Sequence, residues 1–519
     1  MSASPDRSRG ILDVVLIVGF LAALLLPGVN YLRAHDEAAR AEEIRERERR
    51  GRLNPAPNLS WNALESLPQA VDDWWPQRIG LRTPLLKLRG RIWWQLLGEA
   101  PGERMVRGQN GWMFLSRHDF LPLDRGFLDG WRGASAISSD EARAWIDLFA
   151  ERQAWLAERG IAHLVVIAPQ KASLYPEYMP RNFERVGSTS FERVLAEMRA
   201  NEFDVLDLRD ACQVARADDD PATLDFVYHP SGTHWSARGV AVAYRTILDR
   251  LQAQGVALGE PWSDWAVETF SDDADSWEDR LYLDGLVPRT RHELLEQNAP
   301  ALQQTRVPGL RSGHRLARGG AGRSIVLMHD SYGLEVRKLL ALHADVTTLR
   351  TFEFDEGRIE AARPDVVIEL FVERMFDQQD PKVLRRIPTG AEAFDVAPVG
   401  TWSRSDLGPV DVDPTGTRFP IDGLPRDLLG PLLKLVLTSP GEGMLSVVPK
   451  TFSPDRPGAW DGPAAPVHEG RNEIVLRLPK AAMRSGRFDL WLEGAPGTWT
   501  FESGSLREGP VVPESSASD

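Results

Sequence analysis

The 519-residue sequence predicts a layered α/β domain with a mainly parallel sheet, followed by an all-β, sandwich-like module and preceded by a membrane helix. Short apolar runs alternate with amphipathic helical segments between residues 140 and 372, which is the pattern of buried parallel strands covered by helices. After about residue 390 the pattern changes to short alternating runs separated by Pro, Gly and Asp, which favours antiparallel strands. A long apolar stretch near the N-terminus predicts the membrane helix.

The composition excludes several classes of protein. With 61 Lys and Arg residues against 75 Asp and Glu residues, the net charge is −14, which argues against sequence-independent binding to nucleic acid. The single cysteine, Cys212, cannot form an intrachain disulfide and is expected to be a buried, inert thiol. No Cys and His cluster has the spacing of a zinc site, and the sequence shows no cofactor or metal motif.

Residues 1–32 are interpreted as a signal anchor with a transmembrane helix. Val14–Leu26 is uninterrupted apolar sequence, and the stretch continues to Leu32. As a helix, this stretch would extend roughly 28 Å, about one hydrocarbon core. The alternative is a cleaved signal peptide, since Arg7 and Arg9 give a basic start, but no A-x-A-like cleavage site follows.

Residues 33–52 are predicted to form a charged stalk helix. Arginines and glutamates alternate there at helical spacing, as in Glu43 with Arg47 and Glu46 with Arg50. These arginines outnumber the two that precede the apolar stretch, so the positive-inside count by itself places the following chain in the cytoplasm. Large domains translocate largely regardless of charge, so the count leaves the orientation open.

Residues 53–388 are predicted to be the α/β domain, which opens with a Trp-rich, irregular lead-in that extends to Leu115. Apolar residues recur at helical spacing from Asp140 to Gly160 and lead into the apolar run Ala162–Ala168, so a helix precedes a buried strand. The same order predicts strand Phe203–Leu208, helix Ser236–Gln252, strand Ser324–Met328, helix Gly333–Leu342 and strand Val366–Val372.

Residues 389–510 are predicted to form the β-sandwich, and residues 511–519 a disordered tail. Alternating runs predict strands at Leu433–Leu437, Gly443–Val448, Asn472–Leu478 and Arg487–Leu492. The tryptophans of this module either stack on sugar rings at a carbohydrate-binding face or pack in the sandwich core, and core packing is the default for any one of them. They are Trp402, Trp460, Trp491 and Trp499.

Two polar motifs lie where functional residues collect in α/β sheets. In the first, an apolar strand leads into His329-Asp330-Ser331-Tyr332-Gly333 and then into a helix. Ser331 there is either a nucleophile, with helix N-terminal amides stabilising charge on the attacked carbonyl oxygen, or only the cap of the helix. In the second motif, Thr233-His234-Trp235, His234 is either a general base for Ser331 or a structural histidine.

Six motifs occur in the order found in one known family: Val106 to Leu115, Ala168 to Lys171 with Tyr175-Pro176-Glu177, Asp207-Leu208-Arg209, Thr233-His234-Trp235, His329 to Gly333, and Pro364 to Glu369 with Glu373-Arg374. With these motifs, within residues 55–380, the chain resembles the AlgJ/AlgX-type alginate O-acetyltransferase group. The resemblance implies an SGNH-hydrolase-like catalytic domain, with Ser331 as the nucleophile, His234 as the general base and backbone amides near Ser331 in the oxyanion hole.

The resemblance also implies where the protein works and on what. It implies transfer of acetyl groups to hydroxyls of a secreted, alginate-like exopolysaccharide by an enzyme held in the inner membrane by a single pass, with its catalytic domain in the periplasm. A membrane-bound O-acyltransferase is implied as the partner that supplies the acetyl group. Lys171, Tyr332 and Arg374 fall at motif positions and are candidates for substrate binding, with sheet-end ion pairs as the alternative for Lys171 and Arg374.

One position departs from the family pattern. The family carries Asp two residues before the catalytic histidine, and this sequence has Gly232 there. A neutral imidazole needs a partner on its second nitrogen to fix its tautomer and orientation. Asp225 is the candidate for this orienting acid, with Asp218, Asp219, Asp220 or a backbone carbonyl as alternatives.

The leading hypothesis is therefore a Ser/His polysaccharide O-acetyltransferase. A polysaccharide acetyl esterase would use the same Ser331 and His234, with water as the acceptor of the acetyl group. Gly232 also leaves open a catalytically impaired protein that binds polysaccharide or takes part in its assembly.

Overall fold

The structure is a computed structural model that describes residues 14, 16–21, 25, 67–74, 82–116, 127–270, 277–283, 285–287, 291–306, 313–319, 322–381, 384, 402–413, 417–422, 424, 432–449, 464–478 and 487–507. Most of the predicted signal anchor lies outside these residues, and so do the whole stalk 33–52 and the tail 511–519. Within the described residues, no helix has the length and apolar character needed to cross a membrane.

A seven-stranded sheet forms the centre of the α/β domain, in the order β4-β3-β11-β9-β10-β8-β7. Its strands in chain order are β3 (Ala162–Ala168), β4 (Val205–Asp207), β7 (Gln303–Arg306), β8 (His314–Ala317), β9 (Ser324–His329), β10 (Asp345–Leu349) and β11 (Val366–Val372). The strands from β4 to β10 in the sheet order run parallel, and β8 and β7 extend the sheet antiparallel at one edge. This is the mainly parallel sheet that the sequence predicts.

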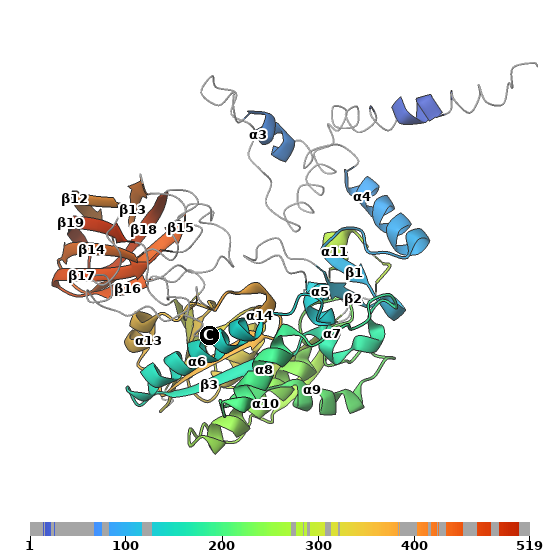
Figure 1. The fold of residues 1–519 in the computed structure, drawn as a ribbon, viewed down its shortest axis with the longest axis horizontal. Coiled ribbons are helices and arrows are strands. Elements are labelled where there is room, and N and C mark those ends of the chain that lie inside the picture. Colours follow the sequence, from blue (N-terminus) through green and yellow to red (C-terminus); the bar gives the residue numbers. More distant parts are fainter. Residues whose placement is uncertain are drawn as a thin grey trace, which may run out of the picture.

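Helices cover both faces of this sheet (Figure 1). They are α6 (Ser139–Ala157), α8 (Ser190–Ala200), α9 (Arg209–Ala215), α10 (Ala237–Ala253), α12 (Gly333–Leu340) and α13 (Glu356–Ala362), with shorter turns at α7 (Lys171–Leu174) and α14 (Met375–Gln378). Because successive strand residues point to opposite faces, Leu164 and Val166 pack with α10 and α12, whereas Val165 and Ile167 pack with α6, α8 and α13. Both faces of the strands are apolar because both are covered.

Local sequence sets the ends of α6. The Ser138 side chain accepts a hydrogen bond from the Glu141 N–H at 3.2 Å, and the Glu141 carboxylate accepts one from the Ser138 N–H at 2.9 Å. The helix ends at Ala157, and Gly160 then turns the chain with φ +68°. The predicted helix Asp140–Gly160 is therefore right in position and three residues too long at its C-terminal end.

Elements that the sequence analysis did not predict lie in the lead-in, between the lead-in and α6, and between α10 and β9. They are α3 (Leu67–Trp74), α4 (Arg82–Arg91), a π-helix (Ile92–Leu97), β1 (Met105–Arg107), β2 (Met113–Leu115), α5 (Phe127–Arg132), β5 (Trp265–Phe270), α11 (Glu278–Leu281) and β6 (Arg291–Glu296). The strands β1 and β2 form one antiparallel hairpin, and β5 pairs antiparallel with β6. Trp94 and Trp112 are buried in this part of the chain.

The C-terminal region is an antiparallel β-sandwich, drawn in orange and red in Figure 1. Its two four-stranded sheets have the orders β12-β19-β14-β17 and β13-β18-β15-β16. The strands are β12 (Trp402–Val412), β13 (Thr417–Asp422), β14 (Leu432–Ser439), β15 (Gly443–Pro449), β16 (Ala464–Val467), β17 (Gly470–Arg477), β18 (Arg487–Gly494) and β19 (Gly497–Arg507). The predicted β-rich module is thus confirmed, and all four predicted strands fall on β14, β15, β17 and β18.

Two of the four sandwich tryptophans can be placed. Trp499 has no exposed surface and packs in the core between the sheets. The indole N–H of Trp491 donates to the Glu493 carboxylate at 2.6 Å, and the Arg418 guanidinium carbon lies 5.9 Å from its ring centroid. Trp499 therefore follows the core interpretation, and the ring of Trp491 already has an arginine beside it.

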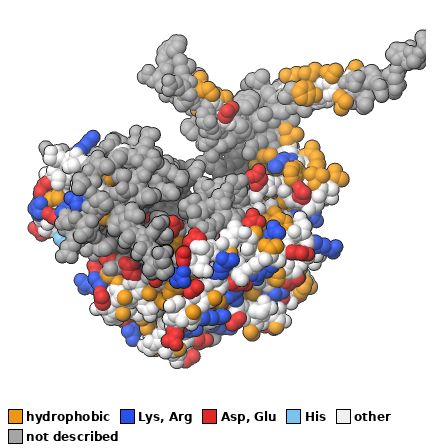
Figure 2. Space-filling view, viewed as in Figure 1, with side chains coloured by type: hydrophobic (Ala, Val, Ile, Leu, Met, Phe, Trp, Pro, Cys, Tyr) orange, Lys and Arg blue, Asp and Glu red, His pale blue; other side chains and the backbone are white. Residues whose placement is uncertain are grey.

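Acidic and basic side chains are interspersed on the visible surface of the α/β domain (Figure 2). Arg152 on α6 and Glu369 on β11 are instead both buried, and they pair with each other. His163 Nε2 on β3 lies 3.0 Å from the second Glu369 oxygen, and Arg152 also donates to the carbonyls of Phe352 at 3.0 Å and Leu384 at 2.8 Å. Burial alone would raise the pKa of the Glu369 carboxyl, but the charge of Arg152 and the His163 hydrogen bond outweigh it and lower that pKa.

Replacing this buried arginine should strongly destabilise the domain. Arg152→Met leaves the Glu369 carboxylate buried without its cation, so we expect the free energy of unfolding in urea to fall by about 3–5 kcal/mol. Arg143→Met is the matched control, because Arg143 lies on the same helix and its partner Asp140 is exposed. The control should unfold like the wild type, and equal losses in the two variants would contradict the role given to the buried pair.

Candidate active site

The carboxyl ends of β3, β11 and β9 meet at one edge of the sheet because these strands are parallel neighbours. Lys171 follows β3, Arg374 follows β11, and Ser331 follows β9. His234 reaches the same edge from the loop that precedes α10. Four of the residues singled out from the sequence therefore come together from four separate segments.

Ser331 lies between β9 and α12 and does not cap the helix. The N-cap position of α12 is Tyr332, which makes no side-chain cap hydrogen bond. The Ser331 Oγ instead lies 2.7 Å from His234 Nε2, within hydrogen-bonding distance. The turn is held by Asp330, whose carboxylate accepts from the backbone N–H of Tyr332 at 2.8 Å and of Val372 at 2.9 Å. The predicted nucleophile and base thus adopt the geometry that proton transfer between them requires.

The start of α12 is packed tightly against the end of β9. A Cβ at Gly333 would lie 2.4 Å from the imidazole of His329, so a glycine is needed for this close approach. His329 is buried, and burial lowers its pKa to about 4, which keeps it neutral at pH 7. Among the hydrogen bonds of the described residues, none uses the Ser331 backbone N–H. This N–H, close to the positive end of α12, is a candidate donor to an oxyanion.

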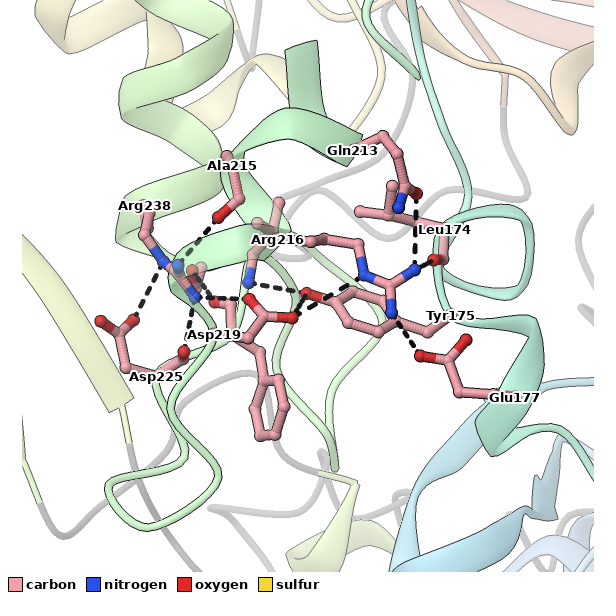
Figure 3. A network of polar contacts seen from close by, with 12 residues as sticks. Leu174, Tyr175, Glu177, Gln213, Ala215, Arg216, Asp219, Asp225 and Arg238 are labelled. Atoms are coloured by element: carbon pink, nitrogen blue, oxygen red, sulfur yellow. Dashed lines mark hydrogen bonds and ion pairs between the residues drawn. The ribbon is translucent and has the colours of Figure 1, made fainter. Parts of the chain in front are cut away.

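The structure does not bring Asp225 to the second nitrogen of His234. His234 Nδ1 lies 3.3 Å from the Thr233 hydroxyl oxygen. The Asp225 Oδ1 lies 3.4 Å from Nε of Arg238, in the first turn of α10, and Figure 3 shows the two side chains facing each other. The prediction that Asp225 orients His234 is therefore wrong, because the Asp225 carboxylate lies beside Arg238 instead.

The alternative aspartates lie elsewhere as well. Asp219 accepts from the Tyr175 hydroxyl at 2.9 Å and from Arg238 at 2.6 Å, in the network drawn in Figure 3. Asp218 and Asp220 are exposed, and Asp220 accepts hydrogen bonds within its own turn. None of the sequence-predicted carboxylates is therefore bonded to His234.

The three predicted substrate-binding residues differ in how much of their side chains is exposed to a ligand. Lys171 is 5% exposed, and its ammonium donates to backbone carbonyls. Tyr332 has no exposed surface, and its hydroxyl donates to the Thr233 carbonyl at 2.8 Å. Arg374 is half-buried, with its guanidinium carbon 5.3 Å from the ring centroid of Tyr332 and 5.5 Å from that of Phe127. Of the three, Arg374 retains the most surface for a ligand.

A small cavity of about 20 Å³, room for about one water molecule, lies beside Arg374 and Thr233, the residue before His234. It is lined by Phe114, Leu115, Phe127, Leu128, Gln170, Lys171, Ala172, Thr233 and Arg374. Five of these residues are apolar, and the other four are polar or charged. Among the residues that the structure describes, no group of His, Cys, Asp and Glu side chains could hold a metal ion.

Sequence reasoning did not single out two carboxylates of the site, Asp330 and Glu373. Glu373 is buried at the end of β11, accepts from the Gln170 N–H at 3.0 Å, and has a pKa raised by burial to about 7. Their positions directly after strands were a usable signal, but the sequence does not show which strand-end carboxylates bind backbone amides. Cys212 is buried as expected, and burial raises its pKa to about 12.

The site thus places a serine, which follows a central parallel strand, beside a histidine from another loop of an α/β domain with helices on both faces of its sheet. Residues 105–334 match the family model described as SGNH hydrolase-like domain, acetyltransferase AlgX. This match confirms the resemblance to the AlgJ/AlgX-type group. The matched segment contains both Ser331 and His234.

Several solved structures are similar to part of the chain. The O-acetyltransferase domain of Pseudomonas putida AlgJ is 18% identical, covers 53% of this chain and 93% of its own, and has a TM-score of 0.36. Bacillus cereus PatB1 is 10% identical, with 53% and 97% coverage and a TM-score of 0.38. Pseudomonas aeruginosa AlgX is 14% identical, with 78% and 95% coverage and a TM-score of 0.34. No curated protein matches the sequence.

The buried Glu373 should make stability depend on pH. Its pKa of about 7 in the folded state lies above the value of about 4.3 in the unfolded chain. The stability that the protonated carboxyl contributes is therefore fully present below about pH 4.3 and is lost as the pH rises to about 7. Glu373→Gln removes this dependence and keeps an acceptor for the Gln170 N–H.

We expect the free energy of unfolding of the wild type, relative to Glu373→Gln, to fall by about 2 kcal/mol between pH 5.5 and pH 8. Urea unfolding of both proteins at the two pH values measures this difference. Groups present in both proteins, such as His329, contribute equally to the two free energies of unfolding and cancel in the difference. A difference that stays constant with pH would show that Glu373 is ionised throughout.

Proposed function

We propose that this protein is a polysaccharide O-acetyltransferase in which Ser331 is the nucleophile and His234 the general base. The observation that carries the proposal is the 2.7 Å contact between Ser331 Oγ and His234 Nε2 inside the segment that matches an acetyltransferase family model.

In the first half-reaction, Ser331 Oγ attacks the carbonyl carbon of an acetyl ester while His234 Nε2 takes the hydroxyl proton. The tetrahedral oxyanion accepts hydrogen bonds from backbone N–H groups, for which the Ser331 N–H is a candidate. When the C–O bond to the donor breaks, His234 returns the proton to the leaving oxygen. The products are the acetyl-serine and the deacetylated donor.

In the second half-reaction, a sugar hydroxyl attacks the acetyl-serine. His234 Nε2 takes the proton of that hydroxyl, and the intermediate collapses to the O-acetylated sugar. The proton then returns to Ser331 Oγ, which restores the enzyme. Water in place of the sugar hydroxyl would release acetate, so exclusion of water is what separates a transferase from an esterase.

The acceptor in this proposal is a secreted, alginate-like exopolysaccharide, and the donor is supplied by a membrane-bound O-acyltransferase. The test is incubation of the purified protein with p-nitrophenyl acetate and deacetylated alginate, followed by measurement of ester-bound acetate in the polymer. Acetate bound to the polymer supports transfer. Free acetate alone would identify an esterase, and polymer binding without either product would identify a binding protein.

Ser331→Ala should reduce acetyl transfer by at least about 10³-fold, and His234→Ala should match it within about tenfold, because nucleophile and base act as one unit. Polymer-bound acetate measures both effects. Ser324→Ala is the matched control, because Ser324 begins the strand that leads to Ser331 and lies at its opposite end. Substantial transfer by Ser331→Ala would remove this serine from the mechanism.

The proposal places the catalytic domain in the periplasm, anchored to the inner membrane by residues 1–32. Support comes from the apolar N-terminal sequence and from the resemblance to an exported family. Protease added to intact spheroplasts should digest the chain beyond residue 52, whereas a cytoplasmic domain would be protected. Protection would overturn the proposed location and leave the chemistry of Ser331 and His234 to its own test.

A further inference from the structure

The ammonium of Lys171 lies in a cage of backbone carbonyls. Lys171 Nζ donates to the carbonyl oxygens of His229 at 2.9 Å, Pro230 at 2.9 Å and Gly232 at 2.6 Å. The ring centroids of Trp112 and Phe114 lie 5.3 and 5.1 Å from the same nitrogen. Three carbonyls match the three N–H donors of an ammonium, and the aromatic faces add favourable electrostatic attraction.

This arrangement ties a buried charge to one short loop. Burying an ammonium is costly unless hydrogen bonds replace its hydration. Here three of the replacing groups are carbonyls of residues 229–232, in the loop that leads to His234. The buried ammonium therefore favours the loop conformation in which these carbonyls point toward it.

Other contacts also fix this loop, which runs from Tyr228 to Trp235. A bridge between Tyr228 and Trp235 closes it, and the His229 N–H donates to the His234 carbonyl at 3.4 Å. The Tyr332 hydroxyl donates to the Thr233 carbonyl at 2.8 Å. The residues before His234 are thus held from the β3 side by Lys171 and from the Ser331 side by Tyr332.

Lys171 is itself anchored to the sheet. It follows Gln170, whose N–H donates to the buried Glu373 carboxylate at 3.0 Å. The Tyr228 hydroxyl donates to the carbonyl of Pro169, which links the start of the loop to the end of β3. A continuous set of hydrogen bonds therefore connects the edge of the sheet that carries Ser331 to the loop that carries His234.

We propose that Lys171 is a positioning residue for catalysis, which holds the imidazole of His234 in line with the Ser331 hydroxyl by binding the carbonyls of residues 229, 230 and 232. The proposal rests on the Ser/His mechanism given above. It replaces the substrate-binding role expected from the sequence. It also gives a physical reason why a loop that lacks the family's aspartate at residue 232 can still present its histidine.

The test compares Lys171→Met and Lys171→Gln with the wild type by two measurements. One is the rate at which a fluorophosphonate probe labels Ser331, which requires activation by His234 but no acetyl acceptor. The other is kcat and KM for acetyl transfer to deacetylated alginate. We expect labelling rate and kcat to fall about 30- to 100-fold, the scale of a misplaced catalytic group, with KM changed less than about threefold.

Controls separate positioning from folding. Lys338→Met removes an exposed lysine of α12 whose partner is Glu335, and it should label and turn over like the wild type. Tyr332→Phe removes the hydrogen bond to the Thr233 carbonyl and the longer one, 3.4 Å, that the hydroxyl accepts from Arg374, and it should lower the labelling rate about 3- to 10-fold. If the Lys171 variants do not fold, this milder variant decides whether the held loop governs Ser331 reactivity.

Restoring activity to a variant with an added cation distinguishes a positioning role from a purely structural one. In Lys171→Ala, added butylammonium should restore part of the labelling rate by placing a cation among the three carbonyls, whereas butanol should not. Unchanged labelling with a raised KM would show that Lys171 contacts substrate and would overturn the proposal. Labelling of wild-type Ser331 without acetyl transfer would instead overturn the proposed function, while the labelling rates would still decide the role of Lys171.

Discussion

The parallel pairing of β11 with β3 on one side and β9 on the other is the constraint on which the rest of the domain depends. Residues Val366–Val372 pair in register with Ala162–Ala168, and β9 joins on the opposite edge of the same strand. Because all three strands end at one edge, the residues that follow them are brought together whatever the length of the intervening chain. The site is therefore a property of strand order and register, and the loops supply its chemistry.

Buried ionisable side chains in this domain are held largely by hydrogen bonds to the backbone. The Asp330 carboxylate binds two amide N–H groups, Glu373 accepts from another, and Lys171 donates to three carbonyls. Even Arg152, which has Glu369 as its partner, also donates to two carbonyls. Backbone dipoles are fixed by the fold, so these charges lose less conformational freedom than they would with flexible side-chain partners. Their positions are correspondingly well defined.

Much of the fold followed from short-range patterns. The run Ala162–Ala168 is a strand with the predicted bounds because a strand buried on both faces is a continuous apolar run. Ser331 and His234 were found because both flank elements with clear patterns. The antiparallel pair β5 and β6 and the antiparallel strands β7 and β8 were missed, since they lack the continuous apolar runs that mark the buried parallel strands.

The partners of individual charges could not be predicted. Asp225 and Lys171 are both close in sequence to site motifs, yet Asp225 pairs with Arg238 and Lys171 turns toward carbonyls. These outcomes depend on which groups the tertiary packing brings within hydrogen-bonding distance of each charge. From sequence position alone, both residues were expected at the site, but their contacts could not be assigned.

The buried state of Cys212 has a practical consequence for studying this protein. Cys212 belongs to α9 and points into the core, and burial raises the pKa of its thiol to about 12, so very little thiolate is present at neutral pH. A cysteine introduced at the surface would therefore react with maleimides far faster than the native one. Pairs of spectroscopic labels, one on the α/β domain and one on the β-sandwich, could be attached to the natural background to measure how the two parts move relative to each other.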